Sequence, residues 1–371
     1  MKRVAVLLAA LCAAVSTTFA ADRPAVQGGV YDKPYLRQTT GGTTVGGYID
    51  HELFWNDKAK TFDQHRFIPF LFSEVSDRIH VAAEIEFEHG GNVGGDGEIK
   101  LEFATLDIAF HEAASLRGGV ILSPLGRFNL IHDSPLNDLT NRPLVAREIV
   151  PTTLSESGMG LFGTFYPSEA AVMGYELYVV NGFADSAATR LRSGRGSQKR
   201  DNNEEKSIVG RLNYSPSLGL DLGGSFHVGA YDDSGEDNLS IFAVDASWNR
   251  GPLDMRGEYA TASIDGARGY QQKDDTDQQE GDESPLLGDS CSGYYAQVAY
   301  HFLPGSLSFP NSTFTVAARY DHIDLGASDE TRTTVGLNFR PEEETVIKLD
   351  YEIYGRDDHG NGLILSLASY F

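Results

Sequence analysis

Apolar and polar residues alternate one by one over many segments of this chain. Between Arg78 and Glu88 every odd-numbered residue is apolar, whereas Glu84, Glu86 and Glu88 on the even positions are acidic. A period of two residues predicts a β-strand with one apolar face, because successive side chains of a strand point to opposite sides. A helix would not place these residues on one face. The same alternation predicts strands over residues 313–321 and 345–354.

The alternation predicts about sixteen strands from Thr43 onward, each of roughly nine to thirteen residues, a length that crosses a bilayer when the strand is tilted. An even number is what a single-chain bacterial barrel requires. Between residues 98 and 111 the alternation changes face near Phe103 and Ala104, which predicts a β-bulge. The predicted strands are 43–56, 65–75, 78–89, 98–111, 115–131, 158–166, 170–183, 207–214, 218–230, 239–249, 252–264, 293–303, 312–324, 331–340, 345–355 and 361–371.

Short and long connections alternate between these strands. The short ones include 76–77, 112–114, 167–169, 215–217, 250–251 and 341–344, and the long ones are 90–97, 133–157, 184–206, 230–238, 266–292 and 355–360. A large soluble sheet, the alternative, gives no reason to keep one end of every hairpin tight. Short periplasmic turns and long extracellular loops are typical of outer-membrane barrels. The sequence therefore predicts an all-β, transmembrane antiparallel β-barrel over residues 43–371. Its first strand should pair with its last, because lipid cannot satisfy an open sheet edge.

The start of the chain has the layout of a secretory signal. Lys2 and Arg3 precede an apolar stretch over residues 4–15, and small residues then stand at the positions that a signal peptidase reads, Thr18 and Ala20. This stretch is too short to span a membrane as a helix, so residues 1–20 are expected to form a cleavable signal peptide. Residues 21–42 are expected to form an irregular periplasmic segment. Export of a barrel by this route predicts the bacterial outer membrane as its location.

Composition removes several other classes of function. The formal net charge of −23 argues against nucleic-acid binding, which depends on Lys and Arg neutralising phosphates. A mean hydropathy of −0.28 is compatible with a barrel, because only alternate residues face lipid. Cys291 is the single cysteine beyond the signal region, so no internal disulfide is expected. The chain lacks the common hydrolase and nucleotide-binding motifs, and we predict no catalytic residue, cofactor or metal site.

The long connection 133–157 is the first candidate for function. It carries charges of both signs, and three prolines stiffen it. If it folds into the lumen, these charges would create a transverse field that filters solutes at a constriction. The alternative is an external loop with solvated charges. The constriction candidates are Asp138, Arg142, Arg147 and Glu148.

Inward-facing charges on the strands are the second candidate. Acidic residues outnumber basic ones there, and rings of carboxylates favour cations, so the sequence leans towards cation selectivity. The alternative is that these charges pair across strands and leave little field. The lumen-facing candidates are Glu84, Glu86, Glu88, Arg256, Glu258, Arg319, Lys348, Asp350 and Glu352.

A basic cluster in the connection 184–206 is the third candidate. One interpretation is that these charges attract anions to the pore mouth. The alternative is a flexible charged loop that contacts lipopolysaccharide phosphates. The cluster consists of Arg190, Arg192, Arg195, Lys199 and Arg200.

Several segments between residues 44 and 183 resemble an outer-membrane porin family, that of the phosphate-selective porins O and P. The resembling segments are 44–49, 84–89, 118–126, 142–145, 150–153 and 158–163. The resemblance implies a sixteen-stranded, trimeric channel. Phosphate-selective members line the pore with an arginine ladder and a lysine cluster, and the acidic inward face of this chain departs from that pattern. Within the connection 133–157, the resemblance implies a role for Arg142 and Arg147, as constriction candidates.

Together these observations predict a porin, a water-filled channel for passive diffusion of small hydrophilic solutes or ions across the outer membrane. The expected surroundings are membrane lipid and lipopolysaccharide, and the expected assembly is a homotrimer. An anion- or phosphate-selective channel is the alternative within transport. An outer-membrane enzyme, or a structural or adhesin barrel whose lumen is plugged, are alternatives from other classes.

Overall fold

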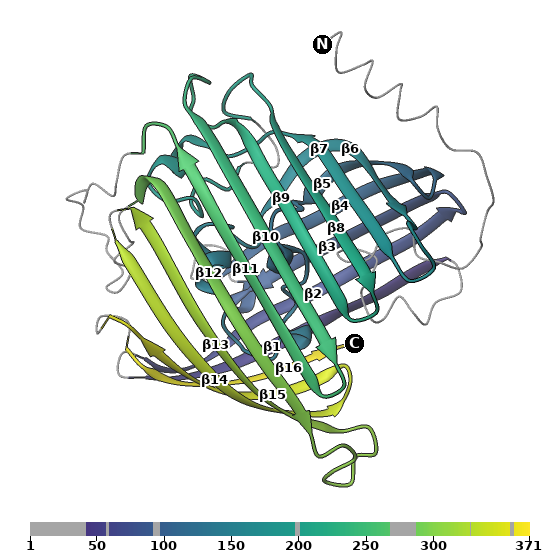
Figure 1. The fold of residues 1–371 in the computed structure, drawn as a ribbon, viewed down its shortest axis with the longest axis vertical. Coiled ribbons are helices and arrows are strands. Elements are labelled where there is room, and N and C mark those ends of the chain that lie inside the picture. The colour runs from purple at the N-terminus through teal and green to yellow at the C-terminus, as the bar shows by residue number, and fades with distance from the viewer. Residues whose placement is uncertain are drawn as a thin grey trace.

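The structure, a computed structural model, describes residues 42–56, 59–91, 97–196, 201–267, 287–326, 328–356 and 360–371. Sixteen antiparallel strands form one closed barrel in which each strand pairs with its neighbours in sequence (Figure 1). The ring closes between β1 and β16, where Tyr48 is paired with Tyr370 and Asn56 with Gly362. The predicted class, strand number and pairing of the first strand with the last are confirmed.

The alternating pattern of the sequence places the strands to within a few residues in most cases. They are β1 (Thr43–Asn56), β2 (Lys60–Ser76), β3 (Ile79–Glu88), β4 (Glu98–His111), β5 (Ala114–Leu122), β6 (Ser155–Phe165), β7 (Val172–Val180), β8 (Ser207–Ser217), β9 (Leu220–Ala230), β10 (Asn238–Arg250), β11 (Leu253–Ile264), β12 (Leu287–Phe302), β13 (Thr313–Gly326), β14 (Asp329–Glu342), β15 (Thr345–Tyr354) and β16 (Gly362–Tyr370). Short helices lie in the connections: η3 (His89–Gly91), α2 (Arg127–Leu130), η4 (Ser134–Leu136), α3 (Leu144–Glu148) and η5 (Asp185–Ala188). In the part of the chain that the structure describes, no helix has the length and apolar character needed to cross a membrane.

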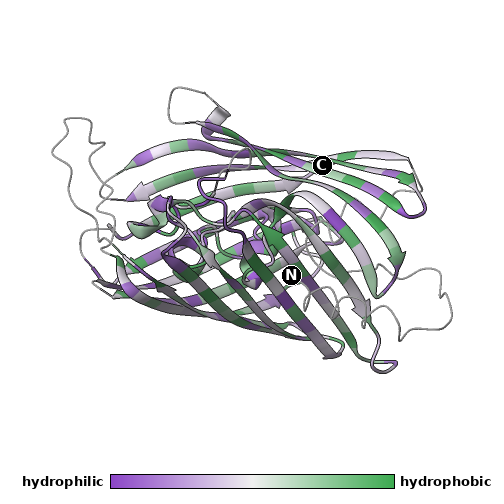
Figure 2. Ribbon diagram, turned by 90° about the horizontal axis from the view of Figure 1, so that it is seen from above, coloured by the Kyte–Doolittle hydropathy of each residue, from purple (hydrophilic) through white to green (hydrophobic). Residues whose placement is uncertain are grey.

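The two faces of the strands have opposite chemistry. On β15 the apolar side chains of Ile347, Leu349 and Tyr351 point outward and are exposed, whereas Lys348 and Asp350 point inward and are buried. Figure 2 shows the same alternation of hydrophobic and hydrophilic residues along the strands. A soluble sheet buries its apolar face, and here the apolar face is the exposed one. This inverted arrangement is what a lipid-facing barrel with a polar interior requires.

The connections at one end of the barrel are mostly tight, and most connections at the other end are longer. Two connections at the longer end are also short, because β1 and β2 are separated by residues 57–59, and β13 and β14 by residues 327–328.

The bulge expected near Phe103 is confirmed: the β3–β4 register passes from Glu84 opposite Phe103 to Ile85 opposite Leu101, so it skips Glu102. Glu102 and Phe103 are therefore both buried, although they are consecutive residues.

The predicted strand 115–131 is wrong beyond Leu122. The chain leaves the wall at Ser123 and turns into the barrel, so the connection begins ten residues earlier than the predicted 133. Pro124 cannot donate a ladder hydrogen bond, and the Asn129 side chain bonds the carbonyl oxygens of Ser123 (2.7 Å) and Leu154 (3.1 Å). These bonds tie together the two ends of the connection. The predicted strand 293–303 also starts too late, because β12 begins at Leu287.

Candidate functional site

The connection between β5 and β6, residues 123–154, lies inside the barrel, and we call it the inner loop. Three inward side chains of β15 hold it at successive heights. Lys348 Nζ donates to the carbonyl oxygen of Ser134 (2.9 Å), and Asp350 accepts the backbone N–H of Thr140 (2.6 Å). Glu352 accepts a hydrogen bond from the side chain of Asn141 (2.9 Å). The inner loop therefore runs along β15, and of the two alternatives that the sequence left open the structure has the one inside the barrel. Its role as a constriction stays a prediction.

The middle of the inner loop is fixed around Asp321 of β13. This carboxylate accepts the backbone N–H of Leu144 (3.1 Å) and pairs with Arg319 (2.9 Å) and Arg332 (3.4 Å). Arg319 also donates to the carbonyl oxygen of Asn141 (2.9 Å), and Arg332 donates to that of Arg142. Apolar residues of α3 pack beside this centre, because Leu144 and Val145 belong to the largest buried apolar cluster.

The start of the inner loop is held by β11 and β9. Glu258 accepts the backbone N–H groups of Arg127 (2.9 Å) and Phe128 (3.1 Å), and Ser225 Oγ accepts that of Gly126 (2.9 Å). Four predicted lumen-facing residues, together with Glu258, thus lie inside the barrel as expected, but they bind the inner loop. These four are Arg319, Lys348, Asp350 and Glu352.

The other predicted lumen-facing charges also lie inside the barrel, and most of them are paired. Glu86 lies 3.1 Å from Arg66 and 2.6 Å from Lys100, and Glu88 lies 3.0 Å from Arg66. Arg256 pairs with Asp138 (3.3 Å), and Glu84 is buried in the wall. Such pairing leaves little net field from these carboxylates. The expected cation preference therefore finds little support at these positions.

The connection between β7 and β8, residues 181–206, packs against the inner loop. Arg190 donates two hydrogen bonds to Glu148 (3.1 and 2.9 Å), and Arg192 donates to the carbonyl oxygen of Thr152 (2.6 Å). Arg195 donates to the carbonyl oxygen of Thr153 (3.0 Å). These three members of the predicted basic cluster are thus docked on the inner loop. Lys199 and Arg200 lie outside the described residues.

A cavity of about 470 Å³, which we call the arginine cavity, opens between these two connections and the wall. Six arginines face two carboxylates around it, so its lining is strongly basic. The charged and imidazole residues of its lining are Arg66, Arg142, Arg147, Arg190, Arg192, Arg332, Asp63, Glu88, His65 and His89.

Crowding of like charges perturbs the titration of the loop residues around this cavity. Burial, and then the neighbouring Arg142 and Arg195, lower the pKa of Arg192 to about 9. Burial and Arg66 lower the pKa of Arg142 to about 10. Burial acts to raise the pKa of Glu148, but the hydrogen bonds from Arg190 and the charge of Arg147 outweigh it and lower this pKa. Glu148 is therefore ionised, and the positive charges of Arg142 and Arg192 are only partly neutralised by their surroundings.

A second cavity, of about 230 Å³, lies at the end of the barrel where the turns are tight, and its lining includes Arg256, Arg340 and Glu344. Residues 135–142 of the inner loop contribute to both cavities, since Asp138 lines the second cavity and Arg142 lines the arginine cavity. The four constriction candidates therefore do not form one ring. Arg142 and Arg147 face the arginine cavity, Asp138 faces the second cavity, and Glu148 is buried beneath Arg147 (3.0 Å) and Arg190.

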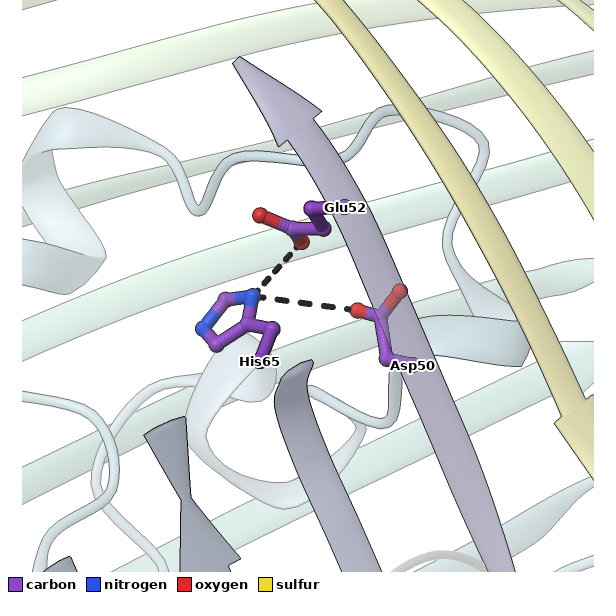
Figure 3. Close-up of side chains that lie close together, drawn as sticks. All are labelled: Asp50, Glu52 and His65. Carbon is purple, nitrogen blue, oxygen red and sulfur yellow. Dashed lines mark ion pairs between the residues drawn. The ribbon is translucent and has the colours of Figure 1, made fainter. Parts of the chain in front are cut away.

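One group of potential metal ligands was not foreseen from the sequence. Asp50, Glu52 and His65 bring one ligand atom each to within 4.8 Å of one another on the wall of β1 and β2 (Figure 3). The alternation places Asp50 and Glu52 inward, but the position of His65 depends on a register shift between these two residues in the β1–β2 pair. A sequence pattern does not reveal such a shift.

No protein-family model matches the sequence. An uncharacterized protein of Aquifex aeolicus is 27% identical over 341 residues, which cover 85% of this chain and 76% of that protein. Among solved structures, the anion-selective porin from Comamonas acidovorans superposes with a TM-score of 0.56 at 12% identity, over 89% of this chain and 99% of the porin. A trimer form of OmpT, an outer membrane protein of Vibrio cholerae, gives a TM-score of 0.56 at 11% identity, over 90% of this chain and 100% of OmpT. The outer membrane channel DcaP of Acinetobacter baumannii gives 0.52 at 12% identity, over 90% and 100% of the two chains.

These similarities concern the fold. At 11–12% identity they carry no assignment of solute or selectivity. Membership of the phosphate-selective porins O and P stays a prediction. The fold of this chain is that of the bacterial outer-membrane porins, a closed antiparallel barrel of sixteen strands.

Proposed function

We propose that the chain forms a channel for passive diffusion of small hydrophilic solutes across the bacterial outer membrane, with a preference for anions. Its exposed apolar outer face suits lipid, and its polar interior suits water and dissolved solutes. The fold shared with porins supports a channel over the enzyme and structural-barrel alternatives.

The arginine cavity is the observation that carries the anion preference. Six arginines line it against the two carboxylates Asp63 and Glu88. Among the described residues, Arg142 and Arg192 form no ion pair, and Arg142 Nε and Nη2 are buried with no hydrogen-bond partner. A mobile anion would supply the missing counter-charge. Even in a water-like dielectric, two opposite unit charges 4 Å apart attract by about 1 kcal/mol, roughly a fivefold enrichment.

The acidic composition of the chain does not oppose this preference. Inward carboxylates that would attract cations are mostly bound to arginines, lysines or backbone N–H groups of the inner loop. A solute meets the charges that remain unbalanced at the surface of a cavity, and around the arginine cavity these are guanidinium groups.

Residues 135–142 of the inner loop supply the proposed constriction. A solute that crosses the barrel by way of the two cavities would pass this segment, because it contributes residues to the lining of both. The inner loop carries Arg142 on one side and Asp138 on the other. This pair of opposite charges would orient a dipolar solute as it passes.

The remaining parts of the proposal concern the setting of the channel. Residues 1–20 would direct export and be cleaved, residues 21–42 would lie in the periplasm, and the barrel would contact lipid and lipopolysaccharide. A homotrimer is supported by the trimer form of OmpT, a protein of the same fold. Analytical ultracentrifugation of the detergent-solubilised barrel would test this assembly.

The deciding experiment is the reversal potential of the refolded barrel in a planar bilayer under a KCl gradient. The wild type should prefer chloride, and the double variant R142Q/R192Q should lose most of that preference. The double variant R78Q/R250Q removes the same formal charge from two exposed positions at the tightly turned end of the barrel and should keep the wild-type sign.

Each departure from these results has a defined meaning. Cation preference of the wild type would overturn the anion assignment and restore the acidic lumen as the governing charge. Equal shifts in the two double variants would overturn the role of the arginine cavity. Absence of channels from folded, heat-modifiable protein would overturn the channel itself.

A further inference from the structure

We infer that Asp50, Glu52 and His65 form a binding site for one divalent transition-metal ion, of the Zn²⁺ type, in the inner wall of the barrel. This site is independent of the proposed transport and would be present whether or not the barrel conducts. Figure 3 shows the three side chains converging, the two carboxylates from β1 and the imidazole from β2.

The distances within the group suit a shared ion after a small adjustment. His65 Nδ1 lies 2.6 Å from Glu52 Oε1 and 3.9 Å from Asp50 Oδ2. Zinc binds imidazole nitrogen and carboxylate oxygen at about 2.0–2.2 Å. Two such ligands in a tetrahedral arrangement are then roughly 3.4 Å apart. One separation has to grow and the other to shrink, each by less than about 1 Å, which side-chain rotation provides.

Glu52 is the observation that distinguishes this group from an ordinary acidic cluster. Its side chain is 1% exposed, and neither of its carboxylate oxygens accepts a hydrogen bond in the described part of the chain. His65 Nδ1 is also buried without a hydrogen bond, so the 2.6 Å approach to Glu52 does not have hydrogen-bond geometry. Buried carboxylates are normally hydrogen-bonded or bound to a cation. A metal ion would satisfy both groups at once.

The surrounding charges leave room for a divalent cation. Arg66, the residue after His65, is balanced by Glu86 (3.1 Å) and Glu88 (3.0 Å). Lys348 is the cation of the neighbouring strands: the strand register places it opposite Ser366, which is in turn opposite Glu52. Arg142 of the inner loop lines the arginine cavity together with His65. Asp50 and Glu52 together therefore exceed the charge of this lysine.

The second layer of side chains orients the imidazole. His65 stacks on His89 with ring centroids 5.7 Å apart and an interplanar angle of 9°, and His89 Nδ1 lies 2.9 Å from Asp63. Ser366 Oγ donates a hydrogen bond to Asp50 Oδ1 (2.8 Å). Asp50 Oδ2, the second carboxylate oxygen, is the one that faces His65. His65 also lines the arginine cavity, so the site has a route to solvent. Fixed ligands with one open side are typical of a metal site that keeps water as a further ligand.

The ligand set indicates which metals would bind. One imidazole nitrogen with two carboxylates suits Zn²⁺, Co²⁺ and Mn²⁺. Ca²⁺ and Mg²⁺ prefer sites made of oxygen alone and larger numbers of ligands. The inference therefore commits to transition metals, and the expected order is Zn²⁺ well ahead of Ca²⁺.

The test is isothermal titration of the untagged, refolded barrel in detergent with ZnCl₂, together with the visible absorption of added Co²⁺. We expect one ion per chain and a Co²⁺ band that Zn²⁺ displaces. E52Q and H65Q should each weaken Zn²⁺ binding by at least tenfold, because each removes one ligand without a large change in shape. The matched control E156Q alters another buried His–carboxylate contact, that of Glu156 with His227 (2.8 Å) between β6 and β9, and should bind Zn²⁺ as the wild type does.

The outcomes separate this site from the channel, because no current is measured. Unchanged binding in folded E52Q and H65Q, or equal loss in E156Q, would overturn the assignment. So would equal competition by CaCl₂, which would indicate a general acidic surface. Heat-modifiable mobility of each variant shows whether it has folded, and if one fails to fold the other still decides.

Discussion

Removing the Asp321 carboxylate should loosen the middle of the inner loop and enlarge the channel. In Asp321→Ala the backbone N–H of Leu144 loses its acceptor, and Arg319 loses its carboxylate partner at 2.9 Å. Arg332 keeps Glu352, at 3.2 Å. A hydrogen bond to a charged group contributes about 1.5–3 kcal/mol, and breaking a buried ion pair costs about 3–5 kcal/mol. The sum is roughly 5–8 kcal/mol.

This loss is comparable to the cost of keeping the segment in one conformation. Fixing the backbone of residues 140–144 costs about 1–2 kcal/mol per residue, or roughly 5–10 kcal/mol for the five. The segment should therefore become mobile. Leu144 and Val145 still bury their side chains, which contributes about 1.5–3 kcal/mol each, so α3 should stay docked. The expected change is local, in the part of the inner loop that lines both cavities.

Single-channel recording in planar bilayers measures this effect. The Asp321→Ala channel should show a larger conductance and more open-channel noise than the wild type. Asp245→Ala is the matched control, because Asp245 pairs with Arg211 in the wall at 2.7 Å and has no hydrogen bond to the inner loop. It should lower stability by a similar amount and leave the conductance unchanged. The reasoning would be refuted by a wild-type conductance in Asp321→Ala, or by equal changes in the two variants.

Three further outcomes are expected. Gly47→Ala should destabilise the barrel by about 1–3 kcal/mol in urea unfolding, because Gly47 has a φ of +152° and an added Cβ would overlap the carbonyl oxygen of Ile68. Leu349→Arg should cost about 2–4 kcal/mol in the same assay in liposomes, because this outward side chain, 46% exposed, lies in the middle of β15. The reversal potential should be constant from pH 6 to 8 and shift away from anion preference from pH 8 to 10. The pKa of Arg192 is about 9, so this guanidinium is charged below that pH and loses its charge above it.

The barrel itself could be predicted from the sequence because its physical signals are local. A period of two residues fixes which side chains of a strand face lipid, and the alternation over residues 345–354 gives β15 its observed faces. The bulge near Phe103 was also visible, since a bulge changes the face on which the alternation continues. The same local signal failed at residues 123–131, where an apolar run continues past the wall. Apolar residues that pack inside a barrel and those that face lipid look alike in a sequence.

The site could be predicted only as a set of residues. Charges of both signs in the connection 133–157 indicated that it matters, but the partners of those charges come from distant strands. Leu144 bonds to Asp321, and Arg190 bonds to Glu148, over separations of 177 and 42 residues. Arginine and aspartate have no periodicity that would reveal such contacts. The chain is acidic overall, but the lining of the arginine cavity is basic because of this pairing. Carboxylates in the wall are neutralised by their partners, whereas guanidinium groups remain at the cavity surface.

The seam between β1 and β16 sets how the molecule has to assemble. The bond between Ser366 and Asp50 joins positions 316 residues apart, so this contact has a very high contact order. Until it forms, the growing sheet keeps two edges whose backbone groups a bilayer cannot satisfy. Partial sheets should therefore be short-lived in lipid, and insertion and ring closure should occur as one cooperative event. Pairing of β1 with β16 should therefore be the last step of folding. A chain in which a substitution weakens this pairing should accumulate as an unclosed intermediate rather than form a smaller barrel.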